Sequence, residues 1–394
     1  MALRRRGDCG TIRRRAEKTA RAPAAQGRNG GAGVPRPIEG DLTPEAAALI
    51  GRLRRRQLVA KLRYGLVPGR ARRARLIHDA TYRSEAELIA HSFASGHGHL
   101  PDMTDPKGYP EKIRWLIVNH RNPLISLVSD KIAVRAYLRY CGATIAAPGL
   151  IGTGHDPDEI LHMPLPDSFA LKASNASGHN HFHEGGPVDR RALARIIAGW
   201  KGTDYWRKNG ELFYRPIPFR FLLEEFLPHR RRKLEYKVFC FHGEPAFISA
   251  IVARQGARLM RAIYRPDWSK ARFGTRGLGI SRDEVPRPAE LPLLLEEARR
   301  LSQHLIFARV DFLHFDDRLA FSEITFANDG ARRPIDPPEM NLAIGRLIDL
   351  SREEAYLAEG RRIAAELGWP GMAAARQAAN DGGNDGRAGL SAGT

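Results

Sequence analysis

The segment ARVDFLHFDDRLAFSEITFANDG, Ala308–Gly330, holds two apolar, strand-like runs on either side of a polar turn. Each run contains one acid, Asp311 in the first and Glu323 in the second. Apolar strands do not need acids, and two carboxylates that meet across a hairpin repel each other unless a positive charge lies between them. The positions of these two acids therefore need an explanation.

A three-residue loop at 316–318 would give an antiparallel hairpin whose facing side chains lie on one side of the sheet. The facing pairs would be Phe315 with Leu319, Leu313 with Phe321, Asp311 with Glu323, and Arg309 with Thr325. Opposed Cβ atoms lie about 5 Å apart, so the two carboxylates could share Mg²⁺ together with the phosphates of a nucleotide. A two-residue loop would break this register and move Glu323 to the opposite face from Asp311.

A structural interpretation of the same hairpin stays open. Charged strand faces are often neutralised by a neighbouring cation, here Arg309 or a nearby lysine, and such ion pairs are common without any function. On the other face, the apolar side chains are expected in the core; they are Val310, Phe312, Ile324 and Phe326.

The positive charge of the chain is concentrated near its start. The 394 residues include 63 Lys and Arg against 44 Asp and Glu. Residues 1–80 hold 20 Lys and Arg against 6 Asp and Glu, a net charge of +14. The remaining residues hold 43 Lys and Arg against 38 Asp and Glu, a net charge of only +5. The basicity therefore belongs to the N-terminal portion, and we expect no specific nucleic-acid face on the main fold.

Other features of composition indicate a cytoplasmic protein. No run approaches about 18 consecutive apolar residues, which excludes an obvious membrane-spanning helix. The basic start is not followed by the apolar stretch of a secretory signal. The three cysteines, Cys9, Cys141 and Cys240, are widely spaced and form neither a metal-type pair nor an even disulfide set.

Mixed helices, strands and hairpins predict an α+β fold rather than a doubly wound parallel sheet. We expect a disordered basic tail over 1–42, a helical N-terminal region over 43–127, and a loose tail over 371–394. Between them we place two α+β subdomains and a C-terminal helix, with the limits 128–218, 219–350 and 351–370.

A helix is predicted to begin after Thr43, since Thr43 can cap it and Pro44 suits its first turn. Leu53, Leu58 and Leu62 place apolar residues beside a strongly basic face. We interpret the segment as a solvated helix packed on the main domain. Peripheral binding to an anionic membrane surface is the alternative.

Two lysines are candidate phosphate ligands. Lys172 ends the apolar strand FALK and enters a loop with glycines, where backbone N–H groups also bind anions. Lys131 is expected near a helix N-terminus. Three alternating histidines, His179, His181 and His183, would share one face of a strand, but they span too far to bind one zinc ion without bending. We interpret them as a polar loop beside an anionic substrate.

Taken together, several motifs of residues 103–350 resemble the ATP-grasp fold, in which two α+β subdomains grip ATP. Within it the chain is similar to the TupA-like ATP-grasp family of teichuronopeptide and cell-surface polysaccharide biosynthesis. The resemblance rests on TDPKGYPEKIRWL, RNPL, SDKIAVRAYL, LPDSFALKASNASG, LLEEFL, EYKVFCFHGEPAFI and FARVDFL…FSEITFANDG.

This resemblance implies roles for individual residues. Lys131, Lys172 and Lys237 would contact the phosphates of ATP, and Ser177 and Gly178 would lie in a loop (173–186) that closes over them. Glu224, Phe226 and Leu227 would contact the adenine. Glu235 would contact the ribose. The metal ligands would be Asp311, Glu323 and Thr325. Arg309 and Lys172 would act in catalysis, and Arg332 and Arg333 would bind the substrate.

The implied activity is ATP- and Mg²⁺-dependent ligation, in which a carboxylate of an anionic glycan or peptide-type acceptor is activated as an acyl phosphate for attack by an amine. Alternatives are phosphoryl transfer to a glycan, or a basic adaptor on membrane or nucleic acid with a degenerate nucleotide site. The sequence departs from the family pattern at Thr325, where many ATP-grasp enzymes have Asn, and at SNASG and ANDGARRP.

Overall fold

The computed structural model describes residues 42–227, 233–253, 260–276, 284–315 and 318–369. Helices and antiparallel sheets are mixed along the chain, so the predicted α+β class is confirmed. Of the two tails that we expected to be disordered, 1–42 and 371–394, only Leu42 is among the described residues, and it packs on the cluster of Ala46, Ile50 and Ala94. No helix among the described residues is long and apolar enough to cross a membrane.

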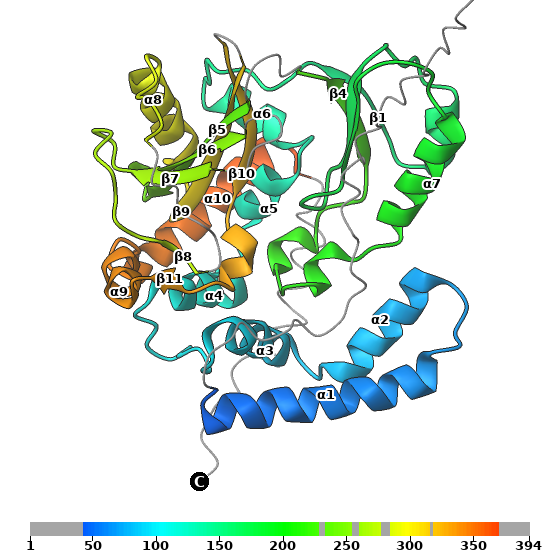
Figure 1. Cartoon of the computed structure of the whole chain (residues 1–394), viewed down its shortest axis with the longest axis vertical. Coiled ribbons are helices and arrows are strands. Elements are labelled where there is room, and N and C mark those ends of the chain that lie inside the picture. Colours follow the sequence, from blue (N-terminus) through cyan, green and yellow to red (C-terminus); the bar gives the residue numbers. More distant parts are fainter. Residues whose placement is uncertain (1–41, 228–232, 254–259, 277–283, 316–317, 370–394) are drawn as a thin grey trace, which may run out of the picture. The chain divides into compact units, whose positions relative to one another are not determined.

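Within the described residues, from Leu42 onward, six helices precede the first strand (Figure 1). They are α1 (Pro44–Tyr64), α2 (Arg70–Thr81), α3 (Glu85–His97), α4 (Tyr109–Asn119), α5 (Pro123–Ser129) and α6 (Val134–Tyr140). The Thr43 hydroxyl accepts a hydrogen bond from the Ala46 N–H, so the predicted cap of α1 is formed. α1 packs on α3 through a small apolar cluster that contains Ala46, Ile50 and Ala94.

The first sheet has the strand order β1-β4-β2-β3. Its strands are β1 (Leu150–Gly154), β2 (Phe169–Ala173), β3 (Asn180–His183) and β4 (Phe221–Glu225). Alternate residues of β2 and β4, including Phe169, Leu171, Phe221 and Leu223, pack against α7 (Arg190–Lys201). Because side chains alternate along a strand, this packing leaves Lys172 and Glu224 on the opposite face.

The second sheet has the strand order β10-β9-β5-β6-β7, all antiparallel. Its strands are β5 (Lys233–Phe241), β6 (Glu244–Ala253), β7 (Met260–Tyr264), β9 (Phe307–Phe315) and β10 (Arg318–Thr325). The β5–β6 hairpin turns at His242 and Gly243, both of which have positive φ. Helix α8 (Leu291–Ser302) packs on one face of this sheet (Figure 1), and Leu294, Ala298 and Leu301 join the largest core cluster there.

The hairpin of β9 and β10 differs from the prediction near its turn. Phe315 pairs with Arg318, so the turn has two residues, and Phe312 pairs with Phe321. A bulge between Phe321 and Glu323 then adds one residue to β10 and restores the predicted pairs of Asp311 with Glu323 and Arg309 with Thr325. The predicted pairs Phe315–Leu319 and Leu313–Phe321 were wrong, because the shorter turn was compensated by a bulge and not by a longer loop.

The remaining elements surround these sheets. They are the short helices η1 (Pro157–Leu161), η2 (Tyr205–Arg207), η3 (Leu212–Tyr214), η4 (Asn328–Ala331) and η5 (Leu350–Arg352), the strands β8 (Gly274–Thr275) and β11 (Ile335–Asp336), and the helices α9 (Pro338–Gly345) and α10 (Glu353–Glu366). The limits of the subdomains stay predictions. β4, which follows the expected limit at 218/219, pairs with β1 and β2 of the first sheet.

Candidate functional site

A row of charged side chains crosses three strands of the second sheet. Lys237 of β5 is in register with Asp311 of β9, which is in register with Glu323 of β10. The Lys237 Nζ lies 2.7 Å from the Asp311 Oδ2. Lys237 and Asp311 alternate with Val238 and Val310, which are buried in the core cluster that α8 joins, so the two acids meet on the face of the sheet opposite α8.

Arg309 lies between the two carboxylates. Its Nε and Nη2 donate to the two Asp311 carboxylate oxygens, each at 2.7 Å, and its Nη2 also donates to the Thr325 Oγ1 at 3.0 Å. The same nitrogen is 3.4 Å from the Glu323 Oε1. The repulsion between the acids is thus offset by Arg309 and Lys237, as the structural interpretation expected.

The oxygen donors that remain fit a hard divalent cation. An ionised carboxylate has about four lone-pair sites, and the hydrogen bonds to Asp311 use three of them, two from Arg309 and one from Lys237. Glu323 is 29% exposed, and its Oε1 accepts from the Thr325 hydroxyl at 3.2 Å. Burial would raise the pKa of Glu323, but the charges of Lys131, Arg309 and Lys237 lower it, which keeps the carboxylate ionised.

A second charged cluster lies on the first sheet. Lys172 and Glu224 share the face of β2 and β4 that does not pack on α7, and the Lys172 ammonium contacts the Glu224 carboxylate. The other Glu224 oxygen accepts from the Arg135 Nη2 of α6 at 3.0 Å. With its side chain only 6% exposed, Glu224 is held between two cations.

Lys131 connects the two clusters electrostatically. Its Nζ donates to the Ala176 carbonyl at 2.6 Å, in the turn between β2 and β3. Burial lowers the pKa of Lys131, the nearby charge of Lys172 acts in the same direction, and Glu323 acts against them. Lys131 lies just before the N-terminus of α6, in a turn where the Asp130 carboxylate accepts the N–H groups of Ile132 and Ala133.

The other predicted nucleotide ligands lie around these clusters. Ser177 and Gly178 are exposed in the turn between β2 and β3. The expected loop 173–186 is not a loop throughout, because residues 180–183 form strand β3. Phe226 and Leu227 follow β4 directly, and Leu227 is buried against Phe315. The Glu235 carboxylate lies 3.3 Å from the Lys237 Nζ on β5.

The two arginines predicted to bind substrate follow η4 and are half-buried. The Arg333 Nη1 donates to the Arg276 carbonyl at 3.5 Å. The Arg332 backbone lies so close to Gly96 of α3 that a Cβ on Gly96 would be 1.8 Å from the Arg332 carbonyl oxygen. The backbone at Arg332 is therefore packed against α3, a contact that the sequence pattern did not predict.

Three contributors to these clusters were missed. Arg135 pairs with Glu224, Asn328 accepts from the Arg309 Nη1, and Arg220 pairs with Asp130 at 2.6 Å. Arg135 follows Lys131 by four residues, a spacing that would place both on one side of a helix predicted there and that could have drawn attention to Arg135.

The three alternating histidines do not form a metal site. His179 stacks on Trp200 with ring centroids 5.8 Å apart, and burial followed by the charge of Lys131 lowers its pKa to about 4. His183 stacks on Phe169 at 5.0 Å. Across the part of the chain that the structure describes, no group of three or more His, Cys, Asp or Glu side chains is arranged to hold a metal ion.

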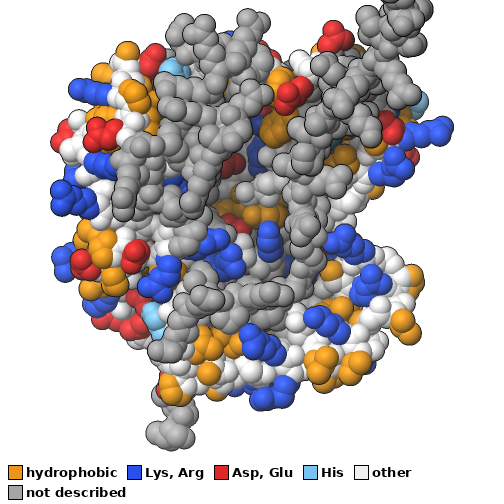
Figure 2. All heavy atoms as spheres, in the orientation of Figure 1, with side chains coloured by type: hydrophobic (Ala, Val, Ile, Leu, Met, Phe, Trp, Pro, Cys, Tyr) orange, Lys and Arg blue, Asp and Glu red, His pale blue; other side chains and the backbone are white. Residues whose placement is uncertain are grey.

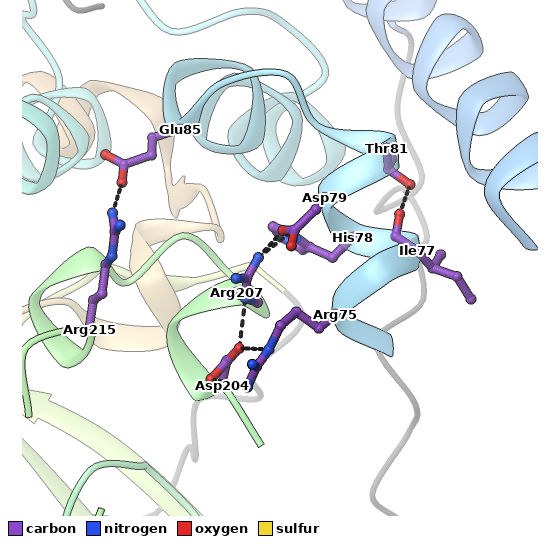
Figure 3. Close-up of polar contacts among 9 residues, drawn as sticks. All are labelled: Arg75, Ile77, His78, Asp79, Thr81, Glu85, Asp204, Arg207 and Arg215. Atoms are coloured by element: carbon purple, nitrogen blue, oxygen red, sulfur yellow. Dashed lines mark hydrogen bonds and ion pairs between the residues drawn. The ribbon is translucent and has the colours of Figure 1, made fainter. Parts of the chain in front are cut away.

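A pocket of about 520 Å³ lies away from both clusters, between α2, the start of α3 and residues 204–215. Figure 3 shows Arg207 reaching Asp79 and Asp204, and Arg75 also reaching Asp204. Every acid drawn in this figure is paired with an arginine, which indicates a structural network that fastens α2 to the segment 204–215.

Two antiparallel sheets with charged side chains directed away from their helix-packed faces match the ATP-grasp class of protein. The chain belongs to the TupA-like ATP-grasp family, whose model matches residues 111–349. The predicted family and fold are thereby confirmed. The match establishes membership of the family and the fold.

Among solved structures, the chain is similar to D-alanine–D-alanine ligase from Helicobacter pylori, with 16% identity, 60% of this chain and 61% of that chain covered, and a TM-score of 0.31. It is also similar to the ATP complex of D-alanine–D-alanine ligase from Bacillus anthracis, with 16% identity, 61% of this chain and 69% of that chain covered, and a TM-score of 0.32. A third similar structure is L-amino acid ligase from Bacillus licheniformis, with 11% identity, 58% of this chain and 53% of that chain covered, and a TM-score of 0.37. The match thus spans about six-tenths of the Helicobacter ligase. Comparison with curated proteins gave no match.

Proposed function

We propose that this protein is an ATP- and Mg²⁺-dependent ligase, which activates a carboxylate as an acyl phosphate and joins it to an amine. The observation that carries the proposal is the alignment of Lys237, Asp311 and Glu323 across three strands, with Lys131 electrostatically linked both to Glu323 and to Lys172. ATP-grasp enzymes in general use ATP and Mg²⁺. Alternating cationic and anionic groups of this kind suit a polyphosphate with its counter-ion.

The nucleotide would lie between the two clusters. Lys131, Lys172 and Lys237 would contact its phosphates, and Ser177 and Gly178 would cover them. On binding, Lys172 would exchange the Glu224 carboxylate for phosphate, which would leave Glu224 paired with Arg135 and free at one oxygen for the adenine edge. The remaining proposed contacts are Phe226 and Leu227 at the adenine and Glu235 at the ribose.

Asp311, Glu323 and Thr325 would hold Mg²⁺. Bound there, the ion would offset the charge on the β- and γ-phosphates. The chain keeps the three donors in place through Arg309, which contacts the side chains of all of them. Thr325 would supply a neutral hydroxyl oxygen where many ATP-grasp enzymes have an Asn amide.

Arg309 would also face the transferred phosphoryl group. Its Nε and Nη2 are committed to Asp311, but its Nη1 donates to the neutral Asn328 side chain, which an anionic group would displace. Arg332 and Arg333 would hold the acceptor carboxylate. A carboxylate oxygen would attack the γ-phosphorus as ADP leaves; the amine nitrogen would then attack the carbonyl carbon, lose a proton, and displace phosphate.

The acceptor would be an anionic glycan or peptide-type carboxylate of cell-surface polysaccharide synthesis, as the family name suggests. The proposal includes a cytoplasmic location with peripheral contact to an anionic membrane.

The test is ADP formation screened over pairs of candidate carboxylates and amines, with hydroxylamine added as a trapping amine. A ligase of this type produces a hydroxamate from the carboxylate alone, and one inorganic phosphate for each ADP when the true amine is present. ADP formation that instead leaves a stable phosphorylated glycan would replace ligation with phosphoryl transfer. Absence of both ATP binding and ADP formation would favour an adaptor with a degenerate site.

A further inference from the structure

The exposed side of α1 carries an apolar stripe that belongs to none of the core clusters of the described residues. Leu58, Val59 and Leu62 are 61%, 63% and 78% exposed, and Leu66, just after the helix, is 98% exposed. At 3.6 residues per turn, the three helical members lie within an arc of about 100°. The core-facing residues of the same helix, Leu53 and Ala60 among them, lie on the other side.

Basic side chains border this stripe. The exposed residues Arg54, Lys61 and Arg63 flank it, and the exposed Arg55 lies one turn before it on the same side of the helix. Residues 46–78 hold ten Lys and Arg and no Asp or Glu. The nearest acid in the contacts of α1 is Glu87 of α3, which pairs with Arg56 on the packed side. Figure 2 shows orange and blue side chains gathered over α1 and α2.

We propose that this face of α1, together with Leu66, docks onto an anionic lipid surface. Leucines and a valine flanked by cations on an otherwise packed helix suit insertion at the boundary between headgroups and acyl chains, with the cations at the headgroups. This inference rests on the peripheral membrane contact included in the proposed function and deepens it; it does not depend on the ligase activity. It names the membrane-contacting face.

The charge and the exposure favour this occupant over two others. A second copy of the chain would bring two surfaces of the same strong positive charge together, with no acid in residues 46–78 to offset them. A nucleic acid would satisfy the arginines but would leave the most exposed apolar side chains, Leu62 and Leu66, without a role.

The experiment measures co-sedimentation of the full chain with vesicles of phosphatidylcholine alone and of equimolar phosphatidylcholine and phosphatidylglycerol. We expect binding only to the anionic vesicles. Leu58→Gln/Leu62→Gln should lower the partition coefficient by about tenfold or more. The matched control, Leu293→Gln/Leu347→Gln, changes two exposed leucines elsewhere (40% and 39%) and should bind as the wild type does.

A second pair of variants tests the charge. Lys61→Glu/Arg63→Glu should weaken vesicle binding strongly, whereas Arg195→Glu/Lys201→Glu on α7 makes the same change in net charge and should have little effect. All variants keep the basic residues 1–41. If those residues alone attracted the vesicles, the α1 variants would bind as the wild type does, and that result would overturn the proposal. Equal losses in test and control pairs would also overturn it. So would a dimer in sedimentation velocity that only the α1 variants abolish while vesicle binding persists.

Discussion

Asp311 and Glu323 face each other across β9 and β10 because Ser322 is accommodated as an extra residue in β10. Without this bulge, Phe321 and Glu323 would share a face, as alternate residues of a regular strand do. With it, Phe321 and Ile324 are both buried in the core while Glu323 lies on the charged face. The bulge thus reconciles a well-packed core with a pair of opposed carboxylates, which is the kind of re-aiming that bulges provide near functional sites.

Because Asp311 is buried and accepts from two cations, we expect Asp311→Asn to lower the free energy of unfolding of the nucleotide-free protein by about 3 kcal/mol. Glu323→Gln should cost less than about 1 kcal/mol, since Glu323 is partly exposed and its contact with Arg309 is longer. Urea denaturation without Mg²⁺ or ATP measures both. Glu244→Gln, which alters an exposed pair with Arg299, is the control.

The expected losses of stability differ from those of two acids that only repel each other. Simple repulsion would make both amide variants as stable as the wild type or more so. That outcome would mean that Arg309 and Lys237 do not neutralise the acids in solution, and it would contradict the site described above.

For turnover, Glu323→Gln should raise the Mg²⁺ concentration required for half-maximal ADP formation by about tenfold or more, because a neutral amide is a poorer ligand for a hard cation than a carboxylate is. Titration of Mg²⁺ at saturating ATP gives the value. Glu244→Gln should leave it unchanged. A normal Mg²⁺ requirement in Glu323→Gln would remove Glu323 from the metal site.

Lys172→Ala should keep the fold and weaken ATP binding by about tenfold or more, the typical effect of losing one charged hydrogen bond. Glu224 would remain paired with Arg135, so the unliganded protein should change little. The measurement is the ATP-dependent rise in Tm, which follows affinity by mass action. Lys201→Ala, which removes an exposed lysine paired with Asp156, controls for charge; equal ATP shifts in both variants would reject the role of Lys172.

Acid should destabilise the protein through its buried histidines. Burial, followed by the charge of Arg54, lowers the pKa of His91 to about 4 from 6.5. The unfolded chain therefore binds more protons below pH 6.5, so this contribution to stability is complete above pH 6.5 and is lost as the pH falls toward 4. At pH 5 the loss is about 2 kcal/mol for one such group.

His91→Gln should reduce the difference in unfolding free energy between pH 7.5 and pH 5 by about that amount. His155→Gln, at an exposed position, should leave the difference as it is. An unchanged pH dependence in His91→Gln would show that His91 is protonated or exposed in the folded protein. His97 and His179, whose pKa values burial lowers to about 3 and about 4, act in the same direction.

Deleting residues 1–41 should leave Tm and ATP binding nearly unchanged, because their composition lacks the apolar pattern of a packed segment and the capping of α1 begins at Thr43. Extending the deletion to Leu42, the limit that the sequence suggested, should cost about 1 kcal/mol, since Leu42 packs on the cluster of Ala46, Ile50 and Ala94. Thermal unfolding of both truncated forms decides this. A large fall in Tm for the shorter deletion would contradict the prediction.

Much of the fold was determined by local pattern. The cap at Thr43, the turn at His242 and Gly243, the amphipathic α8 and the two strands of the acidic hairpin follow from residues close in sequence, since capping, turn conformation and hydrophobic period are local properties. The sequence also indicated which residues are candidates for the site, because burying the charge of an acid or a lysine in an apolar strand costs free energy unless the charge is paired or has a role.

Only the tertiary structure decided which of these residues meet. The two-residue turn and the bulge at Ser322 compensate each other, and a sequence pattern cannot distinguish them from a longer loop, because both bring Asp311 to Glu323. The pairing of Glu224 with Arg135, and the exposure of Leu58 and Leu62 on the outer side of α1, depend on how helices pack on sheets and on one another. Such contacts join residues far apart in the chain, and their energies arise from burial and charge pairing that exist only once the chain has folded.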